Sequence, residues 1–430
     1  MAVQNSYLET NEPELVPLAQ SILSLTQSLS SHLSQLSHPA PTFHSTSAGP
    51  PLTLTYESLR YRLNSAALDL LRLVNGPKNT FRTFLFSHYD LAAYQVALEF
   101  DFFGAVPLDG KVTVQEIAAK VGIDLDRTSR ILRTLATQRV FREVGREGLG
   151  STFEHTALSS MLARDKTLRD AFLMHLDEFF GAASATSMSL HNAPKISDAM
   201  HSPFYARHGV PAYEFYDKNP DKAIRFASAM AGVTKLDHQV TKLRDEFNWA
   251  SLPAGNVVDV GGGSGHVCIQ LAREFTHLKF IIQDRLVMLN EGRELWTDGL
   301  KDRVEFMEHD LFKPQPIHDA SAFFMRHVTH NWTNPDCVRI FRSLVPALEK
   351  CAKGTPLLIN DHVIPEFGEK TSFAEYEIRQ LDMLMCVVLG SKQRSRKEFE
   401  ALLKEADQRF RLVKANSTET IGFLEVYLDT

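Results

Sequence analysis

Residues 257–265, VVDVGGGSG, place five glycine or serine residues directly after an apolar, largely β-branched run. Glycine is needed where the backbone takes unusual dihedral angles or approaches a ligand closely. We expect the apolar run to be a buried strand and the following HVCIQLAREF to be a helix. The turn between them would then lie at the carboxyl edge of a parallel sheet, where doubly wound folds bind ligands. No lysine followed by serine or threonine comes next, which excludes a phosphate-binding P-loop, and the spacing GxGxG differs from the dinucleotide pattern GxGxxG.

Two aspartates end the next two apolar runs. Asp284 ends LKFIIQD, roughly 20 residues after the turn, where an acidic residue accepts hydrogen bonds from ribose hydroxyls. Asp310 ends RVEFMEHD, where a carboxylate suits an adenine amino group. Either aspartate alone would be interpreted as a helix cap or a surface charge. Together with the glycine turn they predict a site for a ligand that contains a nucleoside.

The elements that must position these residues are strands alternating with helices. NVVDV, LKFIIQD, RVEFMEHD, ASAFFMRHV and TPLLINDHVI are strand-like and alternate with helical segments. This alternation predicts βαβ units and a parallel sheet, and the near-continuous apolar character fits strands that are buried on both faces. Residues 409–430 predict further strands, as an antiparallel hairpin at the edge.

The chain before residue 251 is mostly helical in pattern. Leucine and isoleucine recur at helical spacing over 13–36, residues 37–52 are rich in Ser, Pro and His, and a helical pattern resumes over 56–74. We interpret 37–52 as a linker or mobile loop. A further helix is expected from His88, and helices are expected over 168–192 and 211–250.

A winged helix is predicted between these helical segments. The pattern is a helix, a turn at Gly122, a second helix over 126–137 and a short strand pair. The predicted fold class is therefore α/β, with a mostly helical N-terminal region that contains a winged helix and a C-terminal Rossmann-like domain. The expected divisions are 1–80 for dimerisation, 81–165 for the winged helix, 166–250 for helices that line a substrate pocket, and 251–430 for the ligand-binding catalytic domain.

Composition narrows the class of partner. The formal net charge is -6, from 46 basic and 52 acidic residues, which is too mild to indicate a nucleic-acid or anionic-membrane partner. The arginines of the second winged-helix helix have acidic neighbours, so we expect a solvated face and no nucleic acid. No run of 18 apolar residues and no signal-peptide pattern occurs, so we expect no membrane association and a cytoplasmic location. The four cysteines form no CxxC pair and are expected to be buried thiols.

The motifs VVDVGGGSGH, QDR, EHDLFKPQP, FFMRHVTHNWTNPDC and GSKQRS occur in this order. Over about residues 85–430 they resemble the class I S-adenosylmethionine-dependent O-methyltransferases, most closely the fungal secondary-metabolite enzymes related to plant caffeate-type methyltransferases. The resemblance implies S-adenosylmethionine or S-adenosylhomocysteine as the cofactor. It also implies a homodimer in which the winged helix packs against the partner. The cofactor-binding positions that it implies are Gly261, Gly263, Gly265, Asp284, Asp310, Leu311 and Arg326.

The same resemblance implies a catalytic set. His330 occupies the position of the general base, and imidazole suits this role because it titrates near neutral pH. Asp361 and Gln393 occupy the two positions that orient the base. The family has an acidic residue at the second position and often an aspartate where Asn331 follows His330. An amide can orient an imidazole but cannot stabilise the imidazolium, so we expect a weaker base or a reaction that needs less proton abstraction.

Three functions remain open at this point. The first is methyl transfer from S-adenosylmethionine to a hydroxyl of an apolar, polyketide-type small molecule. The alternative is a pericyclase on the same fold, which steers dehydration and cyclisation of a polyketide intermediate with the bound sulfonium as a fixed positive charge. The third is a catalytically silent binding partner. The retained His330 favours methyl transfer, because a pericyclase has no strict need of a base there.

The expected substrate pocket is apolar. Met230 and Met383 match positions that contact the acceptor in the resembled family. The other apolar candidates are more simply interpreted as core; they are Phe102, Phe103, Phe179, Phe180 and Met385. No His/Asp/Glu set has the spacing of metal ligands, so no metal is expected. The apolar stripes of helices 13–36 and 54–75 need a partner to cover them, which also favours a homodimer.

Overall fold

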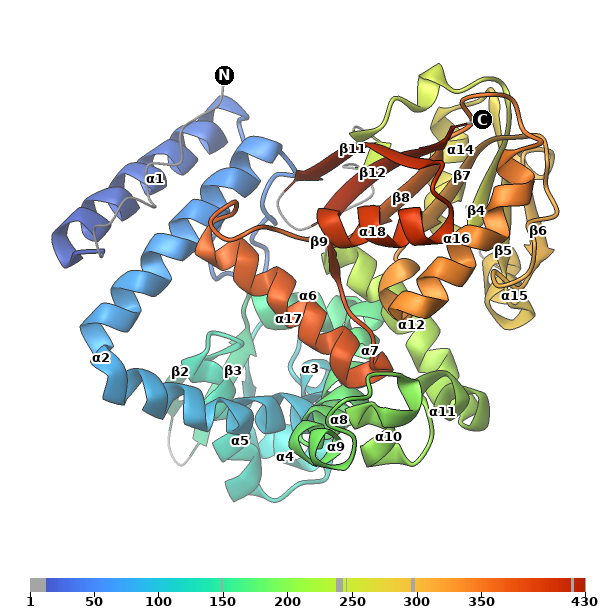
Figure 1. Ribbon diagram of the computed structural model, residues 1–430. Helices are drawn as coiled ribbons and strands as arrows, with labels where there is room; N and C mark the ends of the chain where they lie inside the picture. The colour runs from blue at the N-terminus through green and yellow to red at the C-terminus, as the bar shows by residue number, and fades with distance from the viewer. Residues whose placement is uncertain are drawn as a thin grey trace. The chain divides into compact units, whose positions relative to one another are not determined.

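The computed structural model describes residues 13–147, 150–236, 243–244, 246–294, 298–418 and 421–429 (Figure 1). The chain forms two compact units, one of Met1–Gly181 with Tyr216–Asp237 and one of Ala182–Phe215 with His238–Thr430. The segment 166–250, expected to be one group of connecting helices, is thus divided between the two units.

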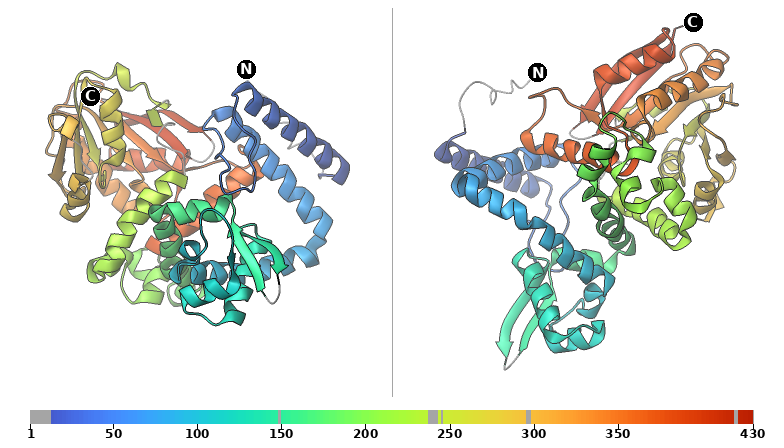
Figure 2. Two further views of the ribbon diagram at one scale, coloured as in Figure 1. Left: turned by 180° about the vertical axis from the view of Figure 1, so that it is seen from behind. Right: turned by 60° about the horizontal axis from the view of Figure 1, so that its bottom comes forward.

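The first unit begins with two long helices that lie side by side (Figures 1 and 2). They are α1, Leu15–Gln35, and α2, Leu54–Glu99. The helical patterns expected over 56–74 and from His88 belong to the one element α2. It is kinked at Gly76, which has φ 60° and precedes Pro77. Proline at this point disfavours a helical conformation for the residue before it, and glycine adopts the positive φ at little cost.

The connector over 37–52 links α1 and α2 without a helix of its own, as expected, and part of it contacts the winged helix. His44 forms a β-bridge with Thr156, and the Phe43 carbonyl accepts a hydrogen bond from the Ala157 N–H at 3.1 Å. The Ser45 carbonyl accepts from the Ser160 hydroxyl at 2.9 Å. These backbone contacts hold the connector against the winged helix.

The predicted winged helix is present. Its elements are α3 (Phe102–Ala105), β1 (Val112–Thr113), α4 (Val114–Val121), α5 (Leu125–Thr137), β2 (Phe141–Glu147), β3 (Gly150–His155) and α6 (Ala157–Arg164). A capping box of Thr113 and Glu116 begins α4, and Gly122 ends it with φ 71°. Phe102 and Phe103 are fully buried in the core of this unit, as their simpler interpretation predicted.

Two further helices of this unit are joined by a buried ionic cluster. Helix α7, Lys166–Met174, runs through a π-helical turn, His175–Phe179, into α8, Phe180–Ala183, and α12 spans Pro220–Leu236. Arg225 of α12 donates to Asp177 and Glu178 of the π-helical turn, each at 2.5 Å. The Tyr216 hydroxyl donates to the other oxygen of Glu178 at 2.5 Å. Glu178 is 2% exposed, so the cluster fixes α12 against α7 by paired charges rather than by apolar packing alone.

The second unit is built on a seven-stranded sheet in the order β11-β12-β8-β7-β4-β5-β6. Neighbours from β8 to β6 pair in parallel, and β12 pairs antiparallel with β8 and β11. The sheet and its antiparallel edge hairpin are therefore as predicted. Its strands are β4 (Gly255–Val260), β5 (Leu278–Asp284), β6 (Val304–Glu308), β7 (Ala320–Arg326), β8 (Leu357–Asp361), β11 (Phe410–Thr418) and β12 (Ile421–Leu428).

Apolar clusters cover both faces of this sheet, so its strands are apolar on both sides. The longer helices are α14 (His266–Glu274), α15 (Leu286–Glu294), α16 (Asn334–Leu348), α17 (Ser372–Leu389) and α18 (Arg396–Ala406). The shorter elements are α9 (Thr186–Asn192), η2 (Ala199–His201), α10 (Pro203–His208), α11 (Ala212–Lys218), η3 (Trp249–Ser251), η4 (Asp298–Leu300), η5 (Thr329–Asn331), β9 (Val363–Ile364) and β10 (Arg394–Ser395). None of the helices in the described ranges is long and apolar enough to cross a bilayer. All four cysteines are free; Cys268 and Cys337 are buried.

Candidate active site

The glycine turn connects β4 to α14. Gly261, Gly263 and Gly265 have φ of 77°, 60° and 73°, a region that residues with a Cβ rarely adopt. A Cβ on Gly265 would lie 2.1 Å from Cδ1 of Ile282 in β5. The turn therefore needs glycine both for its dihedral angles and for its close approach to the neighbouring strand.

Asp284, at the end of β5, lies directly beside this turn. Its Oδ2 accepts a hydrogen bond from the Gly263 N–H at 2.9 Å, and its Oδ1 accepts from the Arg285 N–H at 2.7 Å. The Arg285 guanidinium lies 5.2 Å from the ring centre of Tyr213, which α11 supplies. Burial raises the pKa of Tyr213 to about 12, so its hydroxyl stays protonated beside the carboxylate.

The next loop along the sheet edge carries Asp310 and Leu311. Asp310 Oδ1 accepts a hydrogen bond from the Phe312 N–H at 3.0 Å. Leu311 lies against the turn, because its Cδ2 is 3.9 Å from the position of a Cβ on Gly261. The Phe312 ring meets Trp332 edge to face, with centres 4.8 Å apart. A carboxylate and an apolar wall thus follow the glycine turn, as a purine site requires.

Asp259, inside β4, is a site residue that we did not predict. Its carboxyl group is buried, and burial raises its pKa to about 7. Cys268 donates its S–H to Oδ2 at 3.0 Å, whereas Oδ1 has no hydrogen-bond partner within the described part of the chain. The signal in the sequence is an acidic residue within an otherwise apolar strand, directly before the glycines.

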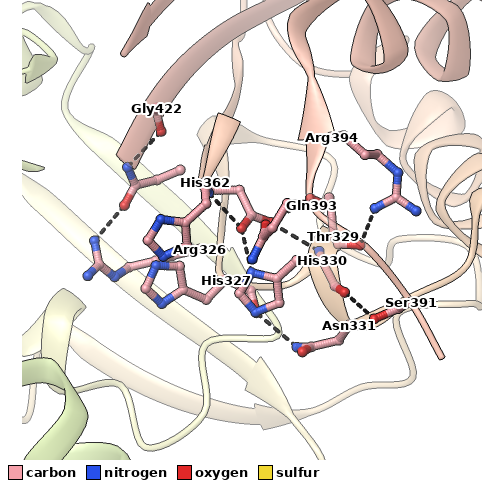
Figure 3. A network of polar contacts seen from close by, with 12 residues as sticks. Arg326, His327, Thr329, His330, Asn331, His362, Ser391, Gln393, Arg394 and Gly422 are labelled. Atoms are coloured by element: carbon pink, nitrogen blue, oxygen red, sulfur yellow. Dashed lines mark hydrogen bonds and ion pairs between the residues drawn. The ribbon is translucent and has the colours of Figure 1, made fainter. Parts of the chain in front are cut away.

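His330 and Asp361 form a close contact between an imidazole and a carboxylate at the site (Figure 3). Nδ1 of His330 lies 2.6 Å from Oδ1 of Asp361, which is 1% exposed. The other carboxylate oxygen accepts from the Thr329 hydroxyl at 2.6 Å and from the His330 N–H at 3.1 Å. The contact with His330 and the hydrogen bond from Thr329 hold the pKa of Asp361 well below its usual range despite its burial. The imidazole is therefore oriented by an ionised carboxylate, with its Nε2 on the opposite side of the ring.

The partner of His330 Nδ1 is Asp361, at 2.6 Å, and not Gln393. The Gln393 N–H donates to Asp382 at 2.8 Å, and its buried Oε1 has no partner among the described residues. Our expectation of a weakened base took Gln393 as a substitute for the orienting acid. The Asp361 carboxylate holds Nδ1, as expected for the first orienting position, and the weaker base expected from the amide at the second position stays a prediction.

Side chains from elsewhere in the chain hold the segment around His330 through hydrogen bonds to its backbone carbonyls. Arg394 is 1% exposed and donates to the carbonyls of Thr329 and Trp332, each at 2.7 Å. Ser391 donates to the His330 carbonyl at 2.5 Å. Asn331 turns away from the imidazole and donates to the His327 carbonyl at 2.9 Å. The GSKQRS motif thus supports the histidine loop mainly through hydrogen bonds from Ser391 and Arg394.

Arg326, His327 and His362 complete the edge of the sheet above β7 and β8. Arg326 Nη1 donates to Asn360 Oδ1 at 2.5 Å, which directs the guanidinium along the strand ends. The rings of His327 and His362 stack with centres 5.2 Å apart and planes 12° apart. The His327 ring centre is 5.4 Å from that of His330. We did not predict His327 or His362 as site residues, although His327 lies within the motif that carries His330.

The predicted acceptor contacts lie in different units. Met230 is half-buried on α12 of the first unit, and Met383 is 52% exposed on α17 of the second. Phe179 is buried in the π-helical turn, whereas Phe180 and Met385 are partly exposed. Across the described ranges, no group of three or more His, Cys, Asp or Glu side chains is arranged to hold a metal ion.

A family model described as the O-methyltransferase domain matches residues 190–409, and one described as the O-methyltransferase dimerisation domain matches residues 83–165. O-methyltransferase sol2 of Alternaria solani is 47% identical over 416 residues, which are 96% of this chain and 95% of that protein. This chain belongs to the O-methyltransferase family. The grayanic acid biosynthesis cluster O-methyltransferase of Cladonia grayi is 32% identical over 96% of this chain and 87% of that protein.

Solved structures share the fold. Mitomycin 7-O-methyltransferase MmcR aligns over 82% of this chain and 98% of its own, with a TM-score of 0.70 and 24% identity. LepI in complex with SAM aligns over 96% and 100%, with a TM-score of 0.72 and 18% identity. Family membership and these structures confirm the fold class, and membership gives the enzyme class, an S-adenosylmethionine-dependent O-methyltransferase. The resemblance inferred from the motifs is therefore confirmed.

The chain's own residues fit that cofactor. The glycines of the turn have no side chains that would cover its backbone, and the carboxylate of Asp284 lies beside it. A carboxylate at this position can accept hydrogen bonds from the hydroxyls of a ribose. The unpartnered Oδ1 of Asp259 can accept a hydrogen bond from a donor at the turn. An unpartnered buried carboxyl oxygen would be costly in a turn that served only to connect a strand and a helix.

Proposed function

We propose that this enzyme transfers a methyl group to a hydroxyl of an apolar, polyketide-type small molecule, with His330 as the general base. The observation that carries the proposal is the 2.6 Å contact between His330 and a buried, ionised Asp361 at the carboxyl edge of the sheet. A relative named chlorophenol O-methyltransferase, from Trichoderma longibrachiatum, supports a phenolic acceptor.

In this proposal the cofactor is held at the first half of the sheet edge. Asp284 binds the ribose, Asp310 and Leu311 flank the adenine, and Arg326 contacts the same ligand. The glycine turn, Gly261–Gly265, lies against the methionine and ribose part of the cofactor. When bound, S-adenosylmethionine supplies an electrophilic methyl group on its sulfonium sulfur.

His330 acts at the second half of the sheet edge. Its Nδ1 faces Asp361, so Nε2 is the nitrogen that can accept the proton of the acceptor hydroxyl. When the bound cofactor supplies its methyl group to the acceptor oxygen, Nε2 would take up the proton that this hydroxyl loses. The Asp361 carboxylate then stabilises the imidazolium, as the aspartate does in a Ser-His-Asp triad. Gln393, which is buried, is proposed to help orient the imidazole of His330 without taking up the proton itself.

The other parts of the chain are proposed to complete the pocket and the dimer. Residues 81–165 would form the homodimer, in agreement with the dimerisation-domain match over 83–165. Residues 1–80 are proposed to add to the dimer, and 251–430 would bind the cofactor. The helices within 166–250 would line the acceptor pocket, to which Met230 and Met383 contribute apolar contacts.

One experiment separates methyl transfer from the pericyclase alternative. Purified enzyme is incubated with methyl-labelled S-adenosylmethionine and a panel of phenolic polyketides. Methyl transfer gives labelled product and one S-adenosylhomocysteine per product, and His330→Ala abolishes both. Product that forms with no cofactor consumed, and that is lost when S-adenosylhomocysteine replaces the donor, would instead establish the pericyclase. The exposed His318 gives a matched control, His318→Ala, which should retain wild-type turnover.

A further inference from the structure

His327 is a histidine of the active site to which the proposed reaction gives no task. It follows β7 directly, and its ring lies beside both His362 and His330: the three ring centres form a triangle with sides of 5.2, 5.4 and 6.4 Å (Figure 3). Its backbone N–H is already committed to the Asn360 carbonyl at 3.0 Å. Its Nε2, by contrast, is enclosed and has no hydrogen-bond partner within the ranges that the structure describes.

A structural histidine of the same chain shows what a satisfied ring looks like. His155, in the core of the winged helix, bonds the Ser159 hydroxyl through Nδ1 at 2.8 Å and the Val106 carbonyl through Nε2 at 3.0 Å. Buried polar atoms without a partner are uncommon because each costs about 1–3 kcal/mol. His327 therefore differs from this core histidine because one of its ring nitrogens is left to bond a ligand.

The backbone at His327 gives independent support. Its φ is 52°, in the left-handed region that few residues other than glycine adopt, and it is one of the non-glycine residues with positive φ in the described chain. Backbone strain of this kind concentrates at functional sites, because elsewhere a less strained conformation is preferred. The strained conformation aligns the His327 ring over His362, with planes 12° apart.

The ring is also uncharged. Burial, reinforced by the positive charge of Arg326, holds the pKa of His327 well below its usual range. A neutral imidazole has one nitrogen that donates and one that accepts a hydrogen bond. His327 can therefore contact either a hydroxyl or a carbonyl oxygen without placing a second cation beside the sulfonium.

We infer that His327 is a specificity-determining residue, which binds a second oxygen on the acceptor carbon next to the one whose hydroxyl reacts at His330. This inference rests on the proposed function. The distance fits, because the two ring centres are 5.4 Å apart and neighbouring phenolic oxygens can each lie at hydrogen-bond distance from one of the rings. The acceptor class is then an aromatic compound with adjacent oxygens, such as an ortho-diphenol or an ortho-hydroxy ketone.

The test uses catechol and resorcinol, which carry the same two hydroxyls in adjacent and in separated positions. Their dissociation constants are measured for the complex of the enzyme with S-adenosylhomocysteine, by calorimetry or NMR titration. Wild type is expected to bind catechol at least about fivefold more tightly than resorcinol, because one additional buried hydrogen bond changes the affinity by about this factor. His327→Phe, which keeps a flat ring but has no nitrogen, should bind the two compounds equally.

Two further variants keep the test decisive. His327→Asn tolerates the positive φ and retains an amide, so it should keep part of the preference even if His327→Phe does not fold. His318→Phe, on the exposed loop before β7, should keep the full preference. Equal binding of both compounds by wild type, no binding of either up to the solubility limit, or an unchanged preference in His327→Phe would overturn the inference. Failure of the proposed function would appear separately, as no uptake of S-adenosylhomocysteine by wild type.

Discussion

Asp361→Asn tests the catalytic pair most directly. The substitution keeps the size of the side chain but removes the charge that faces His330 Nδ1 at 2.6 Å. A hydrogen bond to a charged group contributes about 1.5–3 kcal/mol, and each 1.4 kcal/mol is a factor of ten in rate. If that contact stabilises the imidazolium in the transition state, kcat should fall about 10- to 150-fold from its loss alone.

The fall is expected to be larger than this single contact predicts. The carboxylate of Asp361 also accepts hydrogen bonds from the Thr329 hydroxyl and from the N–H groups of His330 and His362. An amide cannot accept all of these, because its nitrogen donates instead. The imidazole can then adopt the other tautomer, with its proton on Nε2, which in a serine protease costs about 10⁴-fold. We expect a total loss of about 10²- to 10⁴-fold in kcat.

The assay is the release of S-adenosylhomocysteine under saturating acceptor, with its binding measured by calorimetry in parallel. Affinity for S-adenosylhomocysteine should change less than threefold, because the substitution leaves Asp284 and the glycine turn intact. Asp319→Asn, on the exposed segment before β7, is the matched control and should be fully active. An Asp361→Asn enzyme that binds the cofactor normally and retains more than about a third of wild-type kcat would refute the assignment of the pair.

Three other properties can be measured on the same protein. Gly265→Ala places a Cβ 2.1 Å from Ile282 Cδ1 at φ 73°, so it should lose about 1–3 kcal/mol of stability, seen as a lower Tm, together with cofactor affinity. Burial raises the pKa of Asp259 to about 7, so the folded state keeps a proton that the unfolded state releases near pH 4. The free energy of unfolding of the wild type should therefore fall as pH rises from 4 to 7, whereas that of Asp259→Asn lacks this contribution. Measured by urea titration, the stability of Asp259→Asn relative to wild type should rise by up to about 4 kcal/mol from pH 4 to pH 8. A stability difference that stays constant with pH would contradict this. Phe81 and Phe84 on α2 are 72% and 75% exposed, so changing both to Asp should weaken the proposed dimer at least about 100-fold in light scattering, and an unchanged mass would place the interface elsewhere.

Local patterns determined much of this protein. The alternation of apolar runs and helical segments predicted the parallel sheet with its antiparallel edge hairpin, because strand and helix periodicities are properties of short stretches. The glycine turn and Asp284 were predicted to be neighbours for a similar reason. Both follow parallel strands, and the carboxyl ends of parallel strands meet at one edge; the hydrogen bond from Gly263 to Asp284 has this origin.

The tertiary structure decided which side chains become partners. His330 and Asp361 are 31 residues apart, and Arg394 supports the same loop from 65 residues beyond Thr329. No local pattern states that Asp361 rather than Gln393 faces Nδ1, since that depends on how two loops meet above β8. The unsatisfied nitrogen of His327 and the attachment of the 37–52 connector to the winged helix are also outcomes of packing. Sequence spacing sets which elements form, whereas hydrogen-bond partners are settled only when distant segments compete for the same buried space.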